Sequence, residues 1–231
     1  MKLSALQKLT LLDYPGRMAC TVFTAGCNFR CPFCHNSPLV LPGENTETLD
    51  ENTLLDFLNK RLGIIDGVVF TGGEPLLHSD ILELFKKIKN IGYKIKLDTN
   101  GSFPVTLEKA ITEKLVDRVA MDIKNSPADY GKAIGVTNID ISKIEYSKNL
   151  LMTSGIDYEF RTTVVKGIHT KEGMTDLAKW IEGAKEYYLQ QYKDSGNILS
   201  GEGLSEFNKE EMLSLAEAVR PYVPSVTLRG V

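Results

Sequence analysis

The chain is poor in cysteine and has no long apolar run. Only four of its 231 residues are cysteine, which is too few for a disulfide-rich secreted scaffold. No segment approaches the ~20 apolar residues that a membrane-spanning helix needs. The sequence begins Met-Lys-Leu-Ser-Ala-Leu, without an apolar core of signal-peptide length. We therefore expect a cytoplasmic protein with reduced thiols and no membrane partner.

A strong imbalance of charge is also absent. Lysine and arginine number 27 and aspartate and glutamate 30, for a net charge of -3 without runs of like charge. A nucleic-acid-binding surface ordinarily needs a basic patch, so nucleic acid is not expected as a direct partner. The apolar share of 42% and the charged share of 25% are typical of globular proteins. We expect residues 1–231 to form a single domain.

Three of the four cysteines lie close together, at Cys27, Cys31 and Cys34. Clustered thiols in a reducing compartment indicate metal binding or catalysis. Three thiolates can hold a 4Fe–4S cluster by three of its irons and leave the fourth iron open for chemistry. Cys20 lies in the apolar run Met-Ala-Cys-Thr-Val-Phe and is expected to be a buried core residue of a strand. A zinc site is the main alternative, because His35 could supply a fourth ligand.

The rest of the chain alternates between short apolar runs and amphipathic helical runs, which predicts βαβ units and a parallel sheet. A strand around Cys20 is expected to be followed by strands at 67–71, 93–98, 117–122, 158–165, 187–192 and 226–229. Helices are expected at about 54–62, 81–88 after a Ser79 cap, 104–115, 141–152, 177–184 and 210–219. About six βα units fall short of the eight of a closed TIM barrel. We predict an α/β fold with parallel strands in a partial, open barrel.

Polar residues recur where the predicted strands end. The reactive end of a parallel barrel is the carboxyl end of its strands, and buried charge is costly unless it is paired. A ligand-facing cavity at this end explains the pattern. The clustered cysteines occupy a loop between Phe23 and Asp50 that is longer than the usual βα connection, which indicates function. The polar strand ends are Thr24–Cys27, Thr71–Glu74, Asp98–Asn100, Asp122–Lys124, Arg161–Thr163 and Gln190–Gln191.

Each strand end also has a purely structural interpretation. Gly72 and Gly73 could form a tight turn, with Glu74 at the start of a helix. Asp98 and Asp122 could be turn formers or caps, and Lys124 a solvated side chain.

Arginine and histidine allow fewer interpretations. Arg161 is expected to lie in mid-strand, where it needs a carboxylate partner inside the protein. His78 and His169 are expected to be surface or cap residues, and Trp180 lies on a helical stripe and is expected in the core.

Two motifs in a fixed order point to a family. Cys-x3-Cys-x2-Cys, with Phe33 before the last cysteine, is followed at the next strand end by Gly-Gly-Glu-Pro at 72–75. This pair resembles the radical S-adenosylmethionine (SAM) enzymes. Further stretches resemble the glycyl-radical enzyme activating enzymes of that superfamily, and most of all the activating proteins of anaerobic ribonucleoside-triphosphate reductase. These stretches are Asp13–Gly16, Cys34–Asn36, Leu97–Gly101, Ala120–Lys124 and Glu159–Thr163.

The resemblance implies a fold, two cofactors and a set of site residues. It implies a radical SAM core in which Cys27, Cys31 and Cys34 ligate a 4Fe–4S cluster, and the open iron chelates the methionine amino and carboxylate groups of SAM. The other implied contacts are Gly72, Gly73 and Glu74 to the amino group, Phe33 and Asn36 near the adenosyl group, and Asp98, Lys124 and Arg161 to the methionyl or ribose groups. In some relatives a monovalent cation sits beside the carboxylates that match Asp98 and Asp122, so such a cation is a further expectation.

The resemblance also implies an oxidoreductase reaction. Reductive cleavage of SAM would give methionine and a 5'-deoxyadenosyl radical, which would take a hydrogen from the α-carbon of a glycine in a partner protein. Gly230 lacks the Arg-Val-x-Gly-Tyr setting of such a glycine, so this chain resembles the activator. Its four cysteines leave no set for an inserted module with additional clusters. An external donor such as flavodoxin or ferredoxin would supply the electron.

Three alternatives stay open at this stage. The glycyl-radical partner could be of the pyruvate formate-lyase type. The substrate could be a small molecule, as in the 7-carboxy-7-deazaguanine synthases. The chain could also be a non-enzymatic metal-binding or electron-carrier module.

The cysteine assignment predicts opposite outcomes for two substitutions. Cys31→Ala should lose the cluster and all SAM cleavage, whereas Cys20→Ala should keep both, because only the first removes a ligand. Iron and sulfide content after anaerobic reconstitution measures this. A cluster lost with Cys20 would contradict the ligand assignment.

Overall fold

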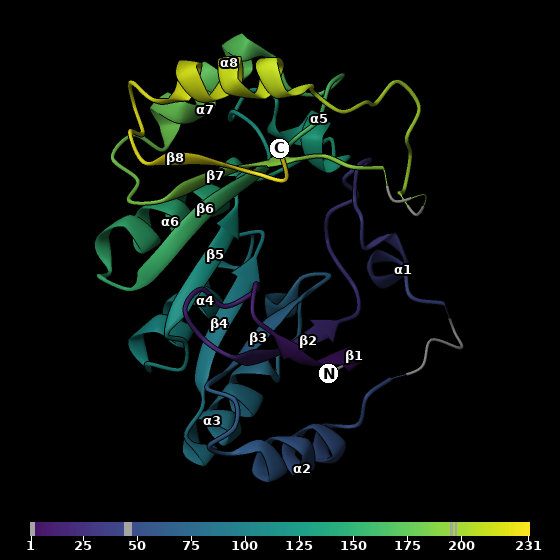
Figure 1. Ribbon diagram of the computed structural model, residues 1–231, viewed down its shortest axis with the longest axis vertical. Helices are drawn as coiled ribbons and strands as arrows, with labels where there is room; N and C mark the ends of the chain where they lie inside the picture. The colour runs from purple at the N-terminus through teal and green to yellow at the C-terminus, as the bar shows by residue number, and fades with distance from the viewer. Residues whose placement is uncertain (1–2, 44–47, 195, 197) are drawn as a thin grey trace.

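The computed structural model describes residues 3–43, 48–194, 196 and 198–231. The described strands form one eight-stranded sheet whose spatial order, β1 to β8, is the order of the sequence. β1 (Leu3–Thr10) pairs antiparallel with β2 (Ala19–Thr24), and all later neighbours pair in parallel. The sheet curves, with β1 and β8 as its two separate edges (Figure 1). The remaining strands are β3 (Gly67–Gly72), β4 (Lys94–Thr99), β5 (Arg118–Asp122), β6 (Asp157–Val164), β7 (Tyr187–Gln191) and β8 (Val226–Arg229).

Helices follow each parallel strand from β2 to β7, which confirms the predicted partial barrel of six βα units. Figure 1 shows the helices on the convex side of the sheet, with the cysteine loop and α1 on the other side. None of the helices in the described residues is both long and apolar enough to cross a membrane. The helices are α1 (Ser37–Val40), α2 (Glu51–Arg61), the 3-10 helix η1 (Pro75–Leu77), α3 (Ile81–Ile91), α4 (Pro104–Thr112), α5 (Tyr130–Ile134), α6 (Ile141–Thr153), α7 (Lys171–Trp180) and α8 (Lys209–Val219).

Several boundaries differ from those that the sequence predicts. β1 and α5 were not predicted. α7 begins after Thr170, whose side chain accepts the amide proton of Gly173, so the helix lies earlier than the predicted 177–184. α4 ends at Thr112 rather than near Leu115, because Lys114 adopts a positive φ of 55° that a helix does not tolerate.

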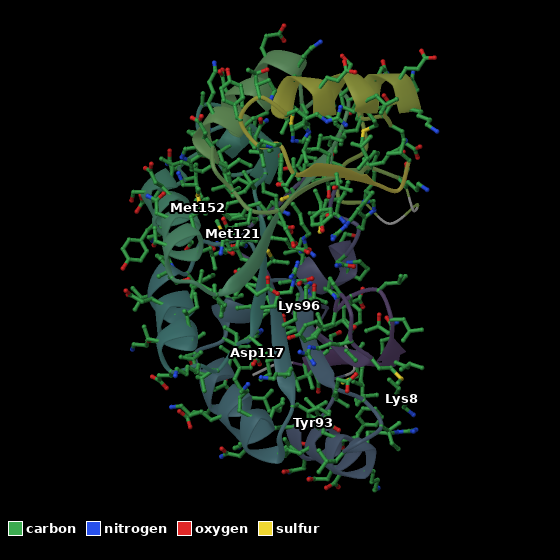
Figure 2. The ribbon with its side chains drawn as sticks, turned by 60° about the vertical axis from the view of Figure 1, so that its left-hand side comes forward. Lys8, Tyr93, Lys96, Asp117, Met121 and Met152 are labelled. Carbon is green, nitrogen blue, oxygen red and sulfur yellow. The ribbon has the colours of Figure 1, made fainter. Side chains whose placement is uncertain are left out.

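The two faces of the sheet differ in chemistry because side chains alternate along each strand. The outward residues, such as Phe70, Leu97 and Met121, belong to the apolar core beneath the helices. The inward residues of β4 to β6 are largely charged. Figure 2 labels Lys96 and Met121, which come from neighbouring strands and lie on opposite sides of the sheet.

A network of ion pairs lies inside the barrel near the amino ends of β5 and β6. Arg118 on β5 binds Asp157 at 2.6 Å and Glu159 at 2.9 Å. The Glu159 side chain is only 1% exposed and also binds Arg229 of β8 at 3.1 Å. Because β7 lies between β6 and β8, this contact spans three strands and ties the last strand to the barrel interior.

The segment between β5 and α6 supports the cysteine loop from outside. The Arg30 amide donates to the carbonyl of Ile134 at 2.8 Å, and the rings of Phe29 and Tyr130 meet edge to face with centroids 6.5 Å apart. Gly135 has φ +64°, and a Cβ added there would lie 2.3 Å from the Arg30 carbonyl oxygen. Glycine is therefore required by both the backbone conformation and the close approach.

Two glycine substitutions separate these requirements. Gly155 has a similar φ of +79° with nothing within 4 Å of an added Cβ, so Gly155→Ala should cost only about 1 kcal/mol of unfolding free energy. Gly135→Ala should cost about 3 kcal/mol or more, since the backbone of the cysteine loop must also move. Chemical denaturation of the apoprotein measures both. Equal losses would show that the contact with Arg30 contributes nothing.

Candidate functional site

The cysteine loop is fixed at its start by backbone hydrogen bonds to α1 and β3. The Gly26 amide donates to the Leu39 carbonyl at 2.6 Å, and the Glu74 amide donates to the Gly26 carbonyl at 2.9 Å. Further along, Arg30 Nη1 donates to the carbonyls of Cys27 at 2.6 Å and Phe29 at 2.7 Å. The cysteines are thus presented by a loop with its own scaffold.

The two glycines after β3 allow that loop to approach. A Cβ on Gly73 would lie 2.0 Å from the Gly26 carbonyl oxygen, and one on Gly72 would lie 2.6 Å from that of Thr24. Gly72 also has φ +112°. Both residues line the cavity described below. The tight-turn interpretation and the cavity interpretation of the Gly-Gly pair therefore both fit the structure.

Glu74 is oriented differently from the prediction. Its side chain is fully buried and is not part of the cavity lining. The carboxyl group accepts hydrogen bonds from the Asn100 amide at 2.7 Å, from Thr99 Oγ1 at 2.8 Å and from the Leu76 amide at 3.0 Å. The prediction that this carboxylate receives the SAM amino group does not fit this geometry. Glu74 instead caps η1, as in the helix-start interpretation, and ties the ends of β3 and β4 together.

Apart from Glu74, the structure brings every residue of the predicted site to one cavity of about 280 Å³ at the carboxyl ends of the strands. Asn36 Nδ2 also donates to the Gly72 carbonyl at 3.4 Å. The roles of these residues toward a ligand stay predictions. The lining residues predicted as cluster or SAM contacts are Cys27, Cys31, Phe33, Cys34, Asn36, Gly72, Gly73, Asp98, Asp122, Lys124 and Arg161. The lining also includes Thr71, Thr99, Asn100, Thr163 and Gln190 from the predicted polar strand ends, His35, which was considered as a zinc ligand, and Phe29 and Val40, which were not predicted.

A chain of five alternating charges runs beside the cavity, and all of its members except Lys96 belong to the cavity lining. Lys96 Nζ lies 2.5 Å from Asp98, which binds Arg161 at 3.0 Å. Arg161 then binds Asp122 at 2.9 Å, and Asp122 binds Lys124 at 2.9 Å. Arg161 and Asp122 are direct neighbours in the register of β5 and β6. The predicted carboxylate partner of Arg161 is therefore confirmed twice over.

Mutual attraction keeps these groups ionised despite their burial. Burial by itself would raise the pKa of Asp122, but Arg161 and Lys124 lower that pKa to about 2. Burial likewise opposes the charge on Lys124, and the nearby Asp122 carboxylate reverses that effect and raises the Lys124 pKa. The cap and solvated-side-chain interpretations of Asp122 and Lys124 do not fit these contacts.

The placement of the three cysteines is compatible with a cluster. They line one cavity and lie within electrostatic reach of one another and of Lys124. Burial raises the pKa of the Cys31 thiol to about 12, so a positive metal centre is needed to hold a thiolate there. Within the described ranges no three His, Cys, Asp or Glu side chains converge on one ion position. A cubane distributes its thiolate ligands over separate irons, so it can take three thiols that do not converge on one point.

The burial and contacts of Cys20 and His169 test two further predictions. Cys20 is fully buried in β2, as predicted, and burial raises its pKa to about 12. The prediction that His169 is a surface or cap residue is wrong. This ring is 3% exposed, its Nδ1 accepts the Val165 amide proton at 3.0 Å, and its Nε2 donates to the Lys124 carbonyl at 2.8 Å. His169 fixes the end of β5, and its ring contacts Phe33 edge to face at 6.2 Å.

The positions of His78 and Trp180 agree better with the predictions of a cap residue and a core residue. His78 ends η1 as a half-buried cap, and its Nε2 lies 3.0 Å from the Ala25 carbonyl in the cysteine loop. Trp180 is half-buried against the core, with its ring 6.0 Å from that of Tyr130. The sequence carried no signal for the histidine contacts, because both rings bind backbone carbonyls of distant segments.

The family follows from a direct match. Residues 21–181 match the model of the radical SAM superfamily. The chain belongs to this superfamily. A relative from Methanocaldococcus jannaschii, provisionally named a glycyl-radical enzyme activating enzyme, is 30% identical over 99% of this chain and 95% of its own length. The GTP 3',8-cyclase of Aquifex aeolicus is 24% identical over 94% of this chain and 69% of its own.

Solved structures agree with this radical SAM fold. The Streptococcus suis protein SuiB, bound to SAM, superposes with a TM-score of 0.69 at 15% identity over 90% of this chain. The protein anSMEcpe with bound AdoMet gives a TM-score of 0.61 at 17% identity over 86% of the chain. The chain spans about half the length of SuiB, 49%. The radical SAM family implies a 4Fe–4S cluster and SAM, which the three cavity thiols and the cavity itself fit.

The buried Glu74 carboxyl predicts a pH dependence of stability. Burial raises its pKa to about 7 from 4.5 in the unfolded chain, against the opposing hydrogen bonds. Its contribution to folding is therefore complete below about pH 4.5 and declines as the pH rises through about 7. Glu74→Gln does not titrate, so the unfolding free energy of the wild-type apoprotein relative to the variant should fall by up to about 3 kcal/mol between about pH 5 and pH 8. A difference between the two proteins that does not change with pH would contradict this.

Proposed function

We propose that this chain is a radical SAM activating enzyme that generates a glycyl radical on a partner protein, which we take to be an anaerobic ribonucleotide reductase. The observation that carries the proposal is a single cavity that joins the three clustered thiols to an ordered set of charges and to the Gly-Gly backbone. The relative that matches along almost its whole length carries the corresponding name. The ribonucleotide reductase partner rests on the sequence motifs alone.

The chain's own residues would bind and orient SAM. Cys27, Cys31 and Cys34 would hold the cluster, which supplies one electron and a chelation site when it is bound. The Lys124 ammonium and the Arg161 guanidinium would attract the methionine carboxylate, and the Gly72–Gly73 backbone offers carbonyl groups to the amino group. Glu74 acts indirectly, by holding this backbone against the end of β4.

The reaction balances with one external electron. That electron cleaves the carbon–sulfur bond of SAM to give methionine and a 5'-deoxyadenosyl radical. The radical takes a hydrogen atom from the partner's glycine α-carbon, which leaves 5'-deoxyadenosine and a glycyl radical. Fixed geometry and exclusion of water protect the radical until it meets that hydrogen. A flavodoxin or ferredoxin would be a suitable donor.

A small-molecule substrate is the competing proposal. The similarity to a GTP 3',8-cyclase extends over most of this chain, and a deazaguanine-forming synthase would use the same cofactors. Activation of a pyruvate formate-lyase type of partner is a further alternative that would use these cofactors on a protein substrate. These candidates share the SAM cleavage step and differ only in which hydrogen is removed. The location of the resulting radical therefore distinguishes them.

The decisive measurement is electron paramagnetic resonance of the reconstituted, reduced protein with SAM and an anaerobic ribonucleotide reductase. We expect a glycine-centred signal on the reductase and one 5'-deoxyadenosine per radical, and neither with Cys31→Ala. Parallel incubations contain pyruvate formate-lyase, GTP or the deazaguanine precursor in place of the reductase. If a radical or a modified product forms only with one of these alternatives, that molecule is the substrate and not the reductase. If no 5'-deoxyadenosine forms under any condition, the proposed enzyme function is contradicted.

A further inference from the structure

The carboxylates of Asp98 and Asp122 already have cationic partners on all four oxygens. Asp98 Oδ1 faces Lys96 Nζ at 2.5 Å, and Asp98 Oδ2 faces Arg161 Nη1 at 3.0 Å. Asp122 Oδ1 faces Arg161 Nε at 2.9 Å, and Asp122 Oδ2 faces Lys124 Nζ at 2.9 Å. The expected monovalent cation would need these same oxygens.

The charge balance also disfavours an added cation. The chain of five charges sets two carboxylates against two lysines and one arginine, and the nearby Glu159 carboxylate is itself bound by Arg118 and Arg229. The side chains of Asp98 and Arg161 are 12% and 14% exposed, so water screens this charge little. A metal cation would have to displace a bound guanidinium or ammonium from these carboxylates. The residues present do not fit the cation.

Arg161 has the shape that the bridging position requires. Its guanidinium is planar and permanently charged, and two of its nitrogens reach the two carboxylates from one side chain. The parallel register places Arg161 directly beside Asp122 on β5, and Asp98 lies one strand further along on β4. The bridge therefore spans three strands and fixes the spacing between the two carboxylates.

We infer that Arg161 is the built-in counter-cation of the Asp98–Asp122 pair, so that this chain orders its SAM-binding wall without a monovalent metal ion. In addition to the attraction to the methionine carboxylate proposed above, Arg161 then does permanently for the two aspartates what a bound ion would do reversibly. Binding of SAM to the cavity rests on the proposed function, but the assignment of the counter-cation does not.

Direct ion binding tests the inference without any cofactor. Thallium(I), which substitutes for potassium, is titrated into the apoprotein and followed by ²⁰⁵Tl nuclear magnetic resonance. We expect no saturable binding to the wild type and new binding to Arg161→Gln, which leaves two carboxylates without their bridge. Lys166→Gln is the matched control. It removes one positive charge from a surface pair with Glu211, outside the cavity, and should behave like the wild type.

The outcomes of this titration are all decisive. Saturable thallium binding by the wild type that competes with potassium and is lost in Asp98→Asn would overturn the inference. If Arg161→Gln does not fold, Arg161→Lys serves in its place, and the wild-type titration decides by itself. The wild-type melting temperature should also be the same in potassium, sodium and choline chloride at equal ionic strength.

SAM cleavage by the loaded enzyme separates this inference from the proposed function. The wild type should cleave SAM at the same rate in potassium, sodium and choline salts. Arg161→Gln should be slower by about tenfold or more, because the binding groups lose their fixed positions. Its activity should return with added potassium or guanidinium, whereas a merely structural loss would respond to neither. A wild type that cleaves SAM only with potassium or sodium would refute the inference alone. A wild type that cleaves no SAM in any salt would refute the proposed function, and the thallium result would still stand.

Discussion

Charge that is buried must be paired, and the inner face of this half-barrel is organised around that constraint. The series from Lys96 to Lys124 runs across β4, β5 and β6, and the two ion pairs of Arg161 link β6 to β5 and to β4. A second network around Glu159 does the same nearer the amino ends. An interior filled with ions would be unstable if any member were missing. With all members present, it holds the wall of the cavity in one arrangement.

The cysteine loop depends on the opposite device, which is the absence of side chains. The loop passes so close to the β3 end and to the segment after α5 that no Cβ fits at Gly73 or Gly135. Backbone hydrogen bonds at both places then fix the loop. His169 adds a third attachment, since it joins the Lys124 backbone to the turn after β6 and its ring contacts Phe33. The cysteine loop is therefore held by contacts on several sides, and Cys27 Sγ also accepts a hydrogen bond from the Phe29 amide at 3.4 Å.

The sequence allowed the class of fold and most of the cavity lining to be predicted, because both have local signals. Alternation of strand and helix patterns indicated the partial barrel, and polar residues at strand ends marked the cavity. The failures concern contacts between distant segments. Nothing near Glu74 indicates that Thr99 and Asn100 turn its carboxylate inward, and nothing near His169 indicates that it is buried against β5. β1 was missed since its burial is irregular and its register is interrupted.

The sheet assigns stability and ligand chemistry to opposite faces. Phe70 and Leu97 pack beneath the helices, while Thr71 and Asp98, which follow them along the strands, line the cavity. Residues on the inner face can therefore be substituted one at a time without changing the hydrophobic core, provided that each new buried charge is paired with an opposite charge. Such a division offers a physical reason why one scaffold can diversify across many substrates while its outer architecture persists.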